Sequence, residues 1–219
     1  MVYVRILMRR FKNYIFDLDA TLYQDNGEVE AGCERLIDQF FMTRLNLPEA
    51  AAHEKRREIL HKFRYEAEAM EPQFGISVKE FMDYICDVDV SHLPRNPFLE
   101  KQLRRLPGRC FIFTDSTAKH ARDTLCQIGV NPDVFTEIFD AEKAGYKFKY
   151  QAEAFECFFE KCRVNPGESV MFEDSLRNLK TARSFGMTTI LISGEAAGEN
   201  VADAQFSDIN KALEVYTEE

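Results

Sequence analysis

Two aspartates, Asp17 and Asp19, follow the short apolar run Tyr14–Phe16 and are separated by a single residue. Alone, such a pair could form a turn, but two carboxylates at the end of a buried strand also suit a site that needs negative charge. A carboxylate next to a divalent cation can attack phosphorus. A second one can protonate the leaving alcohol and then deprotonate the attacking water. If other residues of the chain supply a metal site and phosphate-binding groups, the pair would suit phosphoryl transfer, with Asp17 as the nucleophile and Asp19 as the general acid/base.

Further polar side chains follow two later apolar runs, at the point where each predicted strand ends. Thr114 and Asp115 follow the run CFIF, and Glu173 and Asp174 follow the run VMF. Ligands of an open parallel sheet bind at the carboxyl ends of its strands, so we expect these residues to lie close to the first pair of aspartates.

Carboxylates that are brought this close cannot all stay ionised without a cation. Mg²⁺ prefers oxygen ligands and suits a site that also holds a phosphate. A lysine from the segment GYKFKY, either Lys147 or Lys149, together with hydroxyl or backbone donors, would balance the phosphate oxygens. The sequence thus predicts a magnesium ion and a small phosphorylated substrate at one edge of the sheet.

The segments that carry these residues alternate between strand and helix. Apolar runs predict strands at Tyr14–Phe16, Cys110–Phe113, Glu137–Phe139, Val170–Phe172 and Thr189–Ile192. Helical spacing predicts helices over Thr117–Ile128, Gln151–Cys162 and Ser175–Phe185, and ADAQFSDINKALEVYTEE predicts a last strand and helix. We therefore expect an α/β fold, with a Rossmann-like, mostly parallel sheet and helices on both faces.

Residues 28–95 have almost no strand pattern and instead predict helices. An apolar stripe at helical spacing runs from Leu36 to Leu45, and Pro48 precedes a charged helix that we expect to extend through Phe63. Ser77 and Glu80 fit a capping box at the start of a further helix. We expect residues 1–27 and 96–219 to form the α/β core, and residues 28–95 to form a small all-helical insertion after the first strand.

Four segments of the chain resemble, in order, the motifs of the haloacid dehalogenase (HAD) superfamily of phosphohydrolases: FDLDATL, FIFTDST, a lysine before AEAFE, and MFEDS. The surrounding sequence is similar to the pyrimidine 5′-nucleotidase-like branch, in which a helical cap of the C1 type is inserted after the first motif. The resemblance implies a HAD core with such a cap at 28–95. It also implies Mg²⁺ as the cofactor and hydrolysis of a phosphate ester through an aspartyl-phosphate.

The resemblance also implies a role for each matching residue. Asp17 would be the nucleophile and Asp19 the general acid/base. The phosphate would lie against Thr114, Asp115 and Lys149, where Lys149 is preferred to Lys147 because it keeps the family's spacing to AEAFE. The implied metal ligands are Asp17, Asp19 through its backbone carbonyl, Glu173 and Asp174.

Three residues depart from the family's usual pattern. Ala20 stands where glycine or asparagine is usual after the second aspartate, and Asp115 stands where asparagine is common. Tyr150 replaces the proline that usually follows the lysine, which leaves the lysine loop less rigidly preset. These departures bear on the substrate more than on the reaction, because none of them removes a catalytic group.

Several functions remain open at this point. A nucleoside 5′-monophosphate is the first expected substrate and a phosphotyrosine protein the second. A mutase or phosphotransferase would share every catalytic residue. A carbon–halogen hydrolase would need neither the metal nor Asp19, so Glu173 and Asp174 argue against it. A binding or regulatory module with weakened catalysis is the alternative outside the enzyme class, and Asp115 and Tyr150 motivate it.

Composition and charge restrict the classes of partner that the protein is expected to bind. The 219 residues carry a formal charge of −9, which argues against nucleic acid as the main ligand. No apolar run reaches the roughly 18 residues that a membrane span requires. The segment MVYVRILMRRFK is expected to be an entry strand or leader, with a weak membrane-surface role left open. The sequence does not indicate an oligomeric state.

The cysteines and histidines form no metal motif. The six cysteines lack a C-x-x-C pair, which favours reduced thiols and a cytoplasmic location over disulfides or zinc. The four histidines, at positions 53, 61, 92 and 120, are scattered along the chain, and we expect them to be surface or cap residues.

Overall fold

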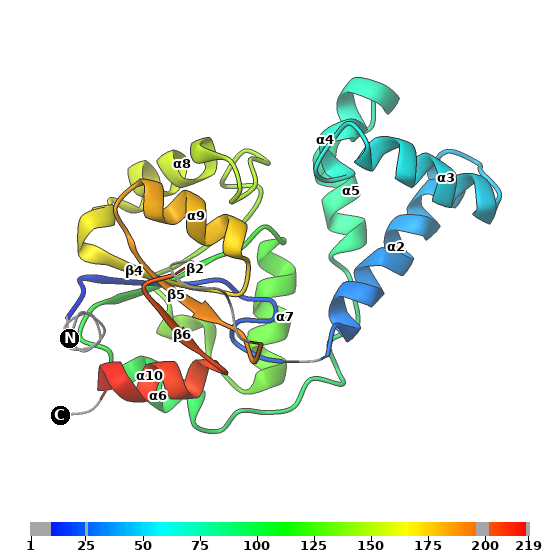
Figure 1. The fold of residues 1–219 in the computed structure, drawn as a ribbon. Coiled ribbons are helices and arrows are strands. Elements are labelled where there is room, and N and C mark those ends of the chain that lie inside the picture. The colour runs from blue at the N-terminus through cyan, green and yellow to red at the C-terminus, as the bar shows by residue number, and fades with distance from the viewer. Residues whose placement is uncertain (1–9, 25, 196–201, 218–219) are drawn as a thin grey trace. The chain divides into compact units, whose positions relative to one another are not determined.

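The computed structural model describes residues 10–24, 26–195 and 202–217 (Figure 1). The predicted N-terminal entry strand or leader falls mainly on residues 1–9, which lie outside the described residues. Contacts divide the chain into two compact units, one from residues 1–25 and 91–219 and one from residues 26–90. No helix in the described part of the chain is both long and apolar enough to cross a bilayer.

The first unit is built on a six-stranded sheet with the order β3-β2-β1-β4-β5-β6, in which every neighbouring pair is parallel. This arrangement confirms the predicted α/β fold and each predicted strand. Its strands are β1 (Asn13–Phe16), β2 (Arg109–Phe113), β3 (Glu137–Phe139), β4 (Ser169–Glu173), β5 (Thr188–Ile192) and β6 (Ala204–Phe206).

Alternate residues of the central strands point to opposite faces of the sheet, and helices cover both faces. One face contributes Ile15, Phe113 and Met171 to a core with α8 (Ala152–Cys162) and α9 (Leu176–Ser184). The other face contributes Tyr14 and Phe172, whose rings both contact Tyr216 of α10 (Ile209–Thr217). Figure 1 shows α8 and α9 on one side of the sheet and α6 (Leu99–Arg105) and α10 on the other.

The helices of this unit begin and end close to the predicted residues. Helix α7 (Ala118–Ile128) follows Thr117, whose side chain accepts a hydrogen bond from the backbone of His120, and it ends at Gly129 with φ of 86°. Only glycine adopts that left-handed conformation without steric cost, which explains why the helix stops there. Short 3₁₀ turns at Pro132–Val134 and Pro166–Glu168 precede β3 and β4.

The second unit is helical and has its own aromatic core. Phe40 and Phe41 of α2 (Glu28–Arg44) contact the ring of Phe81 of α5 (Val78–Ile85), and all three are buried. The predicted apolar stripe therefore forms this core. The remaining elements are α3 (Glu49–Leu60), α4 (Ala67–Ala69) and a π-helical turn at Met70–Phe74.

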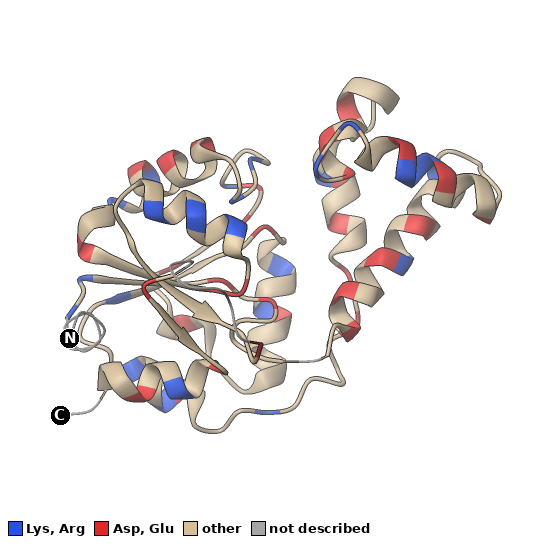
Figure 2. Ribbon diagram, in the orientation of Figure 1, with Lys and Arg blue, Asp and Glu red and all other residues tan. Residues whose placement is uncertain are grey.

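Two expectations about this unit are wrong in detail. The charged helix α3 ends at Leu60 and does not reach Phe63, because the chain turns there through hydrogen bonds from residues 62 and 63 to the carbonyl of Ile59. Ser77 begins α5 but its side chain caps no backbone N–H, and Glu80 instead forms an ion pair with Arg44 at 2.8 Å. Acidic and basic residues mix along α2 and α3, as Figure 2 shows.

Candidate active site

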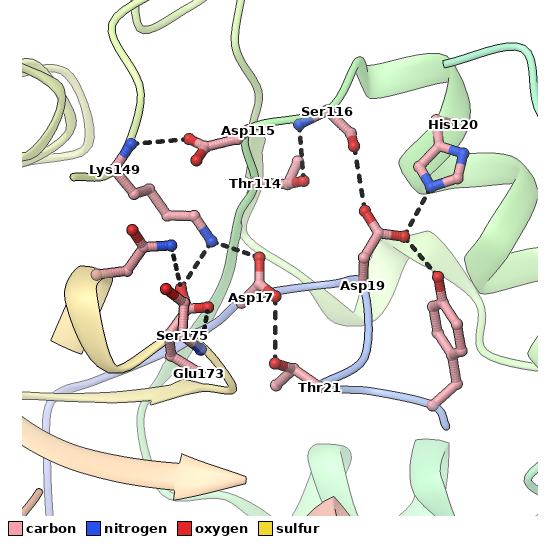
Figure 3. Close-up of polar contacts among 12 residues, drawn as sticks. Asp17, Asp19, Thr21, Thr114, Asp115, Ser116, His120, Lys149, Glu173 and Ser175 are labelled. Carbon is pink, nitrogen blue, oxygen red and sulfur yellow. Dashed lines mark hydrogen bonds and ion pairs between the residues drawn. The ribbon is translucent and has the colours of Figure 1, made fainter. Parts of the chain in front are cut away.

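The predicted site residues follow neighbouring strands of the sheet. Asp17 comes directly after β1, Thr114 directly after β2, and Glu173 ends β4. Strand β1 lies between β2 and β4, and its continuation is held by a hydrogen bond of 2.9 Å from the Asp17 N–H to the carbonyl of Phe172. The fold therefore brings all three strand ends to one edge of the sheet, as parallel strands require (Figure 3).

A buried lysine joins two of these strand ends. The Nζ of Lys149 lies 2.8 Å from Oε2 of Glu173 and also donates to Oδ1 of Asp17, and the lysine side chain is only 2% exposed. Lys147, the other candidate, is exposed. The oxygens of Glu173 also accept hydrogen bonds from the Ser175 backbone at 3.1 Å and from Asn178 at 3.3 Å. One ammonium group thus sits between two carboxylates inside the protein.

This burial changes the proton affinity of the cluster. Burial, together with the charges of Glu173 and Asp19, outweighs Lys149 and raises the pKa of Asp17 to about 8. Burial likewise raises the pKa of Glu173 to about 7, with Asp174 contributing and Lys149 opposing. The pKa of Lys149 is well above its usual value, because the Asp17 and Glu173 carboxylates outweigh its burial. One lysine therefore does not supply enough positive charge for these carboxylates.

The same carboxylates fit a bound cation. Asp17, Glu173 and Asp174 each offer an oxygen atom, and these three atoms lie within 4.8 Å of one another. All are hard oxygen donors of the kind that Mg²⁺ prefers, and Asp174 is exposed, so a hydrated ion can reach it. A divalent cation there would favour the ionised carboxylates and lower their pKa values.

Asp19 lies apart from the lysine and is surrounded by donors. Its Oδ1 accepts from the hydroxyl of Tyr23 at 2.6 Å and lies 2.7 Å from Nε2 of His120, and its Oδ2 accepts from the hydroxyl of Ser116 at 3.1 Å (Figure 3). Burial raises the pKa of Asp19, but the hydrogen bond and charge of His120, with the two hydroxyls, outweigh it and hold this pKa below its usual value.

His120 corrects the expectation that all four histidines are surface or cap residues. Its side chain is 2% exposed and belongs to α7 of the α/β unit. Burial lowers the pKa of His120, but Asp19 outweighs it and raises this pKa above its usual value. Tyr23 was not predicted as a site residue, and its only signal in the sequence is its position four residues after Asp19. Ser116 lies within the second motif, FIFTDST, directly after Asp115.

Side chains that follow β1 and β2 form hydrogen bonds that hold the loops of the site in place. The Thr114 hydroxyl accepts the Ser116 N–H at 3.0 Å, and Oδ1 of Asp115 accepts the Lys149 N–H at 2.9 Å. Asp115 therefore holds the loop that carries Lys149 and Tyr150. The Thr21 hydroxyl donates to Oδ2 of Asp17 at 3.1 Å.

The backbone explains why Ala20 is unusual. Its φ is 57°, in the left-handed region that glycine and asparagine adopt most readily. The turn that carries Asp19 away from Asp17 thus requires this conformation, and the chain accepts the cost of an alanine there.

Comparison with known families and structures agrees with this geometry. The family model described as "Haloacid dehalogenase-like hydrolase" matches residues 14–192, which is most of the chain. No curated protein sequence matches the chain significantly.

Solved structures share the fold at low sequence identity. A HAD phosphatase from Thermococcus onnurineus is 22% identical with a TM-score of 0.64, over 93% of this chain and 97% of that one. YfnB from Bacillus subtilis, bound to magnesium, is 16% identical with a TM-score of 0.63, over 96% and 100% of the two chains. A 2-haloacid dehalogenase from Pseudomonas syringae pv. Tomato DC3000 is 18% identical with a TM-score of 0.61, over 94% and 97%.

Proposed function

Because the chain belongs to the family of haloacid dehalogenase-like hydrolases, we propose that it is a Mg²⁺-dependent phosphomonoesterase that works through an aspartyl-phosphate. The observation that carries the proposal is the pairing of two differently placed aspartates. Asp17 lies among Lys149, Glu173 and Asp174, whereas Asp19 lies in a separate group formed by the Tyr23 and Ser116 hydroxyls and the His120 imidazole. Two carboxylates with different surroundings suit two different roles.

In the first step, an oxygen of Asp17 attacks the phosphorus of the ester. The bond between phosphorus and the ester oxygen breaks, and the leaving oxygen takes a proton from Asp19. Lys149 and the hydroxyl of Thr114 would lie against the phosphate oxygens and offset the charge that gathers on them. The Thr21 hydroxyl, 3.1 Å from Oδ2 of Asp17, would hold the nucleophile in place.

In the second step, water attacks the phosphorus of the aspartyl-phosphate. Asp19, now ionised, takes a proton from this water, and Asp17 leaves as a carboxylate. Inorganic phosphate is released and Asp19 is protonated again, so the protons balance over one cycle.

Asp17 and Asp174 would hold the Mg²⁺ ion, together with the backbone carbonyl of Asp19. Glu173 would complete this site, directly or by anchoring Lys149, because its oxygens already accept from three donors. When bound, Mg²⁺ supplies positive charge next to the phosphate. The magnesium in the YfnB structure supports this choice of ion.

Dehalogenation is the competing hydrolysis, since structures of 2-haloacid dehalogenases share the fold. That reaction needs no metal and no acid two residues after the nucleophile. The carboxylates around Asp17 and the donors around Asp19 would have no role in dehalogenation. Their presence therefore favours phosphatase activity. Assays for halide release from 2-chloropropionate should accordingly be negative.

The substrate proposal rests on sequence resemblance. A nucleoside 5′-monophosphate is the first candidate and a phosphotyrosine protein the second, and we propose that the helical unit serves as the cap. We also propose a cytoplasmic location, which the free thiols of Cys110, Cys126, Cys157 and Cys162 support. Parallel assays of 5′-nucleotides and phosphotyrosine peptides would rank the two substrate classes.

The direct test of the activity uses p-nitrophenyl phosphate. The wild-type protein should release p-nitrophenol with Mg²⁺ and stop when EDTA removes the metal. Asp17→Asn should lower kcat by on the order of 10⁴-fold. Asp123→Asn, an exposed aspartate paired with Lys119 on α7, is the matched control and should retain full activity. Folded, Mg²⁺-loaded protein that hydrolyses no phosphomonoester would favour the binding or regulatory module.

A further inference from the structure

The donors around Asp19 are not distributed evenly between its two oxygens. Among the residues that the structure describes, Oδ1 receives two donors, the Tyr23 hydroxyl at 2.6 Å and Nε2 of His120 at 2.7 Å, whereas Oδ2 receives only the Ser116 hydroxyl at 3.1 Å. A carboxylate oxygen has two lone pairs, so both of those on Oδ1 are engaged. Figure 3 shows His120 on one side of the carboxylate and Ser116 on the other.

The two groups that hold Oδ1 are themselves fixed. The His120 side chain is 2% exposed and Tyr23 is 7% exposed, whereas the Asp19 side chain is 33% exposed. The first turn of α7, which carries His120, is tied at both Thr117 and Ala118. The Thr117 hydroxyl accepts the His120 N–H, and Oδ2 of Asp140 accepts the Ala118 N–H at 2.9 Å. Buried, anchored donors therefore orient a partly exposed acid.

We propose that His120 is a positioning residue that, together with Tyr23, anchors Oδ1 of Asp19 and so assigns proton transfer to Oδ2. This inference rests on the proposed phosphatase function. The proton that reaches the leaving oxygen comes from Oδ2, and the proton from the attacking water returns to Oδ2. The Ser116 hydroxyl can donate to Oδ2 when it is ionised and accept from it when it is protonated, because a hydroxyl does both. Oδ1 keeps its two donors throughout.

Leaving groups of different basicity separate this role from a purely structural one. p-Nitrophenolate leaves without needing a proton, whereas an alkoxide leaves poorly unless it is protonated. If the orientation of Asp19 is lost, the cleavage of alkyl phosphates should therefore slow, whereas the cleavage of p-nitrophenyl phosphate should change little. The constant to compare is kcat/KM, since it covers the steps up to departure of the first leaving group.

The experiment measures kcat/KM with Mg²⁺ for p-nitrophenyl phosphate and for a simple alkyl phosphate such as propyl phosphate. His120→Leu, which cannot donate, should lower the value for propyl phosphate by about 10²-fold and change that for p-nitrophenyl phosphate by less than about threefold. His120→Gln, whose amide can reach the position of Nε2, should restore most of the loss. His92→Leu replaces an exposed histidine of the same unit and should change neither value.

Tyr23→Phe removes only a hydroxyl and provides the same comparison if His120→Leu fails to fold. It should show the same dependence on the leaving group, with a smaller loss. If the variants lose kcat/KM equally on both substrates, or lose none on either, the positioning role is overturned. The proposed phosphatase function would still stand in that case, provided that the wild type turns over. If the wild type hydrolyses neither ester, the proposed function fails and the inference fails with it.

Discussion

The Nζ of Lys149 lies 2.8 Å from Oε2 of Glu173, and both side chains are almost fully buried. The same Nζ donates to Asp17, so one ammonium group links the ends of β1 and β4 to the loop after β3. Removing one partner of a buried ion pair destabilises a protein far more than removing one partner of an exposed pair. The remaining buried charge then has no opposite charge beside it and is poorly hydrated.

Lys149→Met should therefore destabilise the metal-free protein strongly. It leaves Asp17 and Glu173 buried without a cation, and the expected loss in the free energy of unfolding is about 3–5 kcal/mol at pH 8. Denaturant unfolding measures this loss. Lys147→Met removes an exposed lysine two residues away and should change the stability by less than about 0.5 kcal/mol. Similar losses for both variants would contradict the buried bridge.

The stability of the metal-free protein should fall as the pH rises from 5 to 8. Burial raises the pKa of Asp17 to about 8 and of Glu173 to about 7, so the folded protein binds more protons than the unfolded chain in this range. The slope is negative by about 1.4 kcal/mol per pH unit for each extra proton. The raised pKa of His120 acts in the same direction, since its stabilising effect is lost as the pH rises.

Magnesium should reduce this pH dependence. An ion bound at Asp17 and Asp174 favours the ionised carboxylates, so the melting temperature should rise with Mg²⁺, and more at pH 8 than at pH 5. Thermal melts at both pH values, with and without EDTA, measure the difference. A stabilisation by Mg²⁺ that is equal at the two values would argue against binding at this cluster.

The central features of the site could be predicted from the sequence because they depend on strand ends. Asp17, Thr114 and Glu173 each end an apolar run, and a parallel sheet necessarily brings such ends together. His120 could not be placed in this way, because its bond to Asp19 depends on how α7 packs, over a separation of 101 residues. The predicted capping box failed for the same kind of reason, because Glu80 pairs with Arg44 of α2, a tertiary contact that local patterns do not contain.

Ala20→Gly should stabilise the protein. Ala20 has a φ of 57°, a conformation that destabilises the folded state by about 1–2 kcal/mol when the residue is alanine. Glycine removes this strain, but its greater conformational freedom in the unfolded chain cancels part of the gain. The expected gain is up to about 1 kcal/mol by denaturant unfolding. The matched control is Ala31→Gly within helix α2, which should lose about 1 kcal/mol. A loss at position 20 would show that alanine is not strained there.

Asp115→Asn should preserve the loop and improve phosphate binding. In the native protein Oδ1 of Asp115 accepts the Lys149 N–H at 2.9 Å, and the amide oxygen of asparagine can accept the same hydrogen bond. The substitution also removes a negative charge near the phosphate. We expect the KM for p-nitrophenyl phosphate to fall about fivefold, corresponding to about 1 kcal/mol. Asp115→Ala removes the acceptor as well and should lower kcat/KM. A rise in KM for Asp115→Asn would mean that the charge itself is required.

In the proposed mechanism Asp17 carries the phosphoryl group during the reaction, and this intermediate can be trapped. The Asp19→Asn protein, given Mg²⁺ and p-nitrophenyl phosphate, lacks the base for the second step and should accumulate the phosphoenzyme. Intact-mass and peptide mass spectrometry after an acid quench should find one phosphoryl group, on Asp17, and none when Asp17→Asn is added. If the wild type turns over while the quenched Asp19→Asn protein carries no phosphoryl group, or carries it on another residue, Asp17 is not the nucleophile.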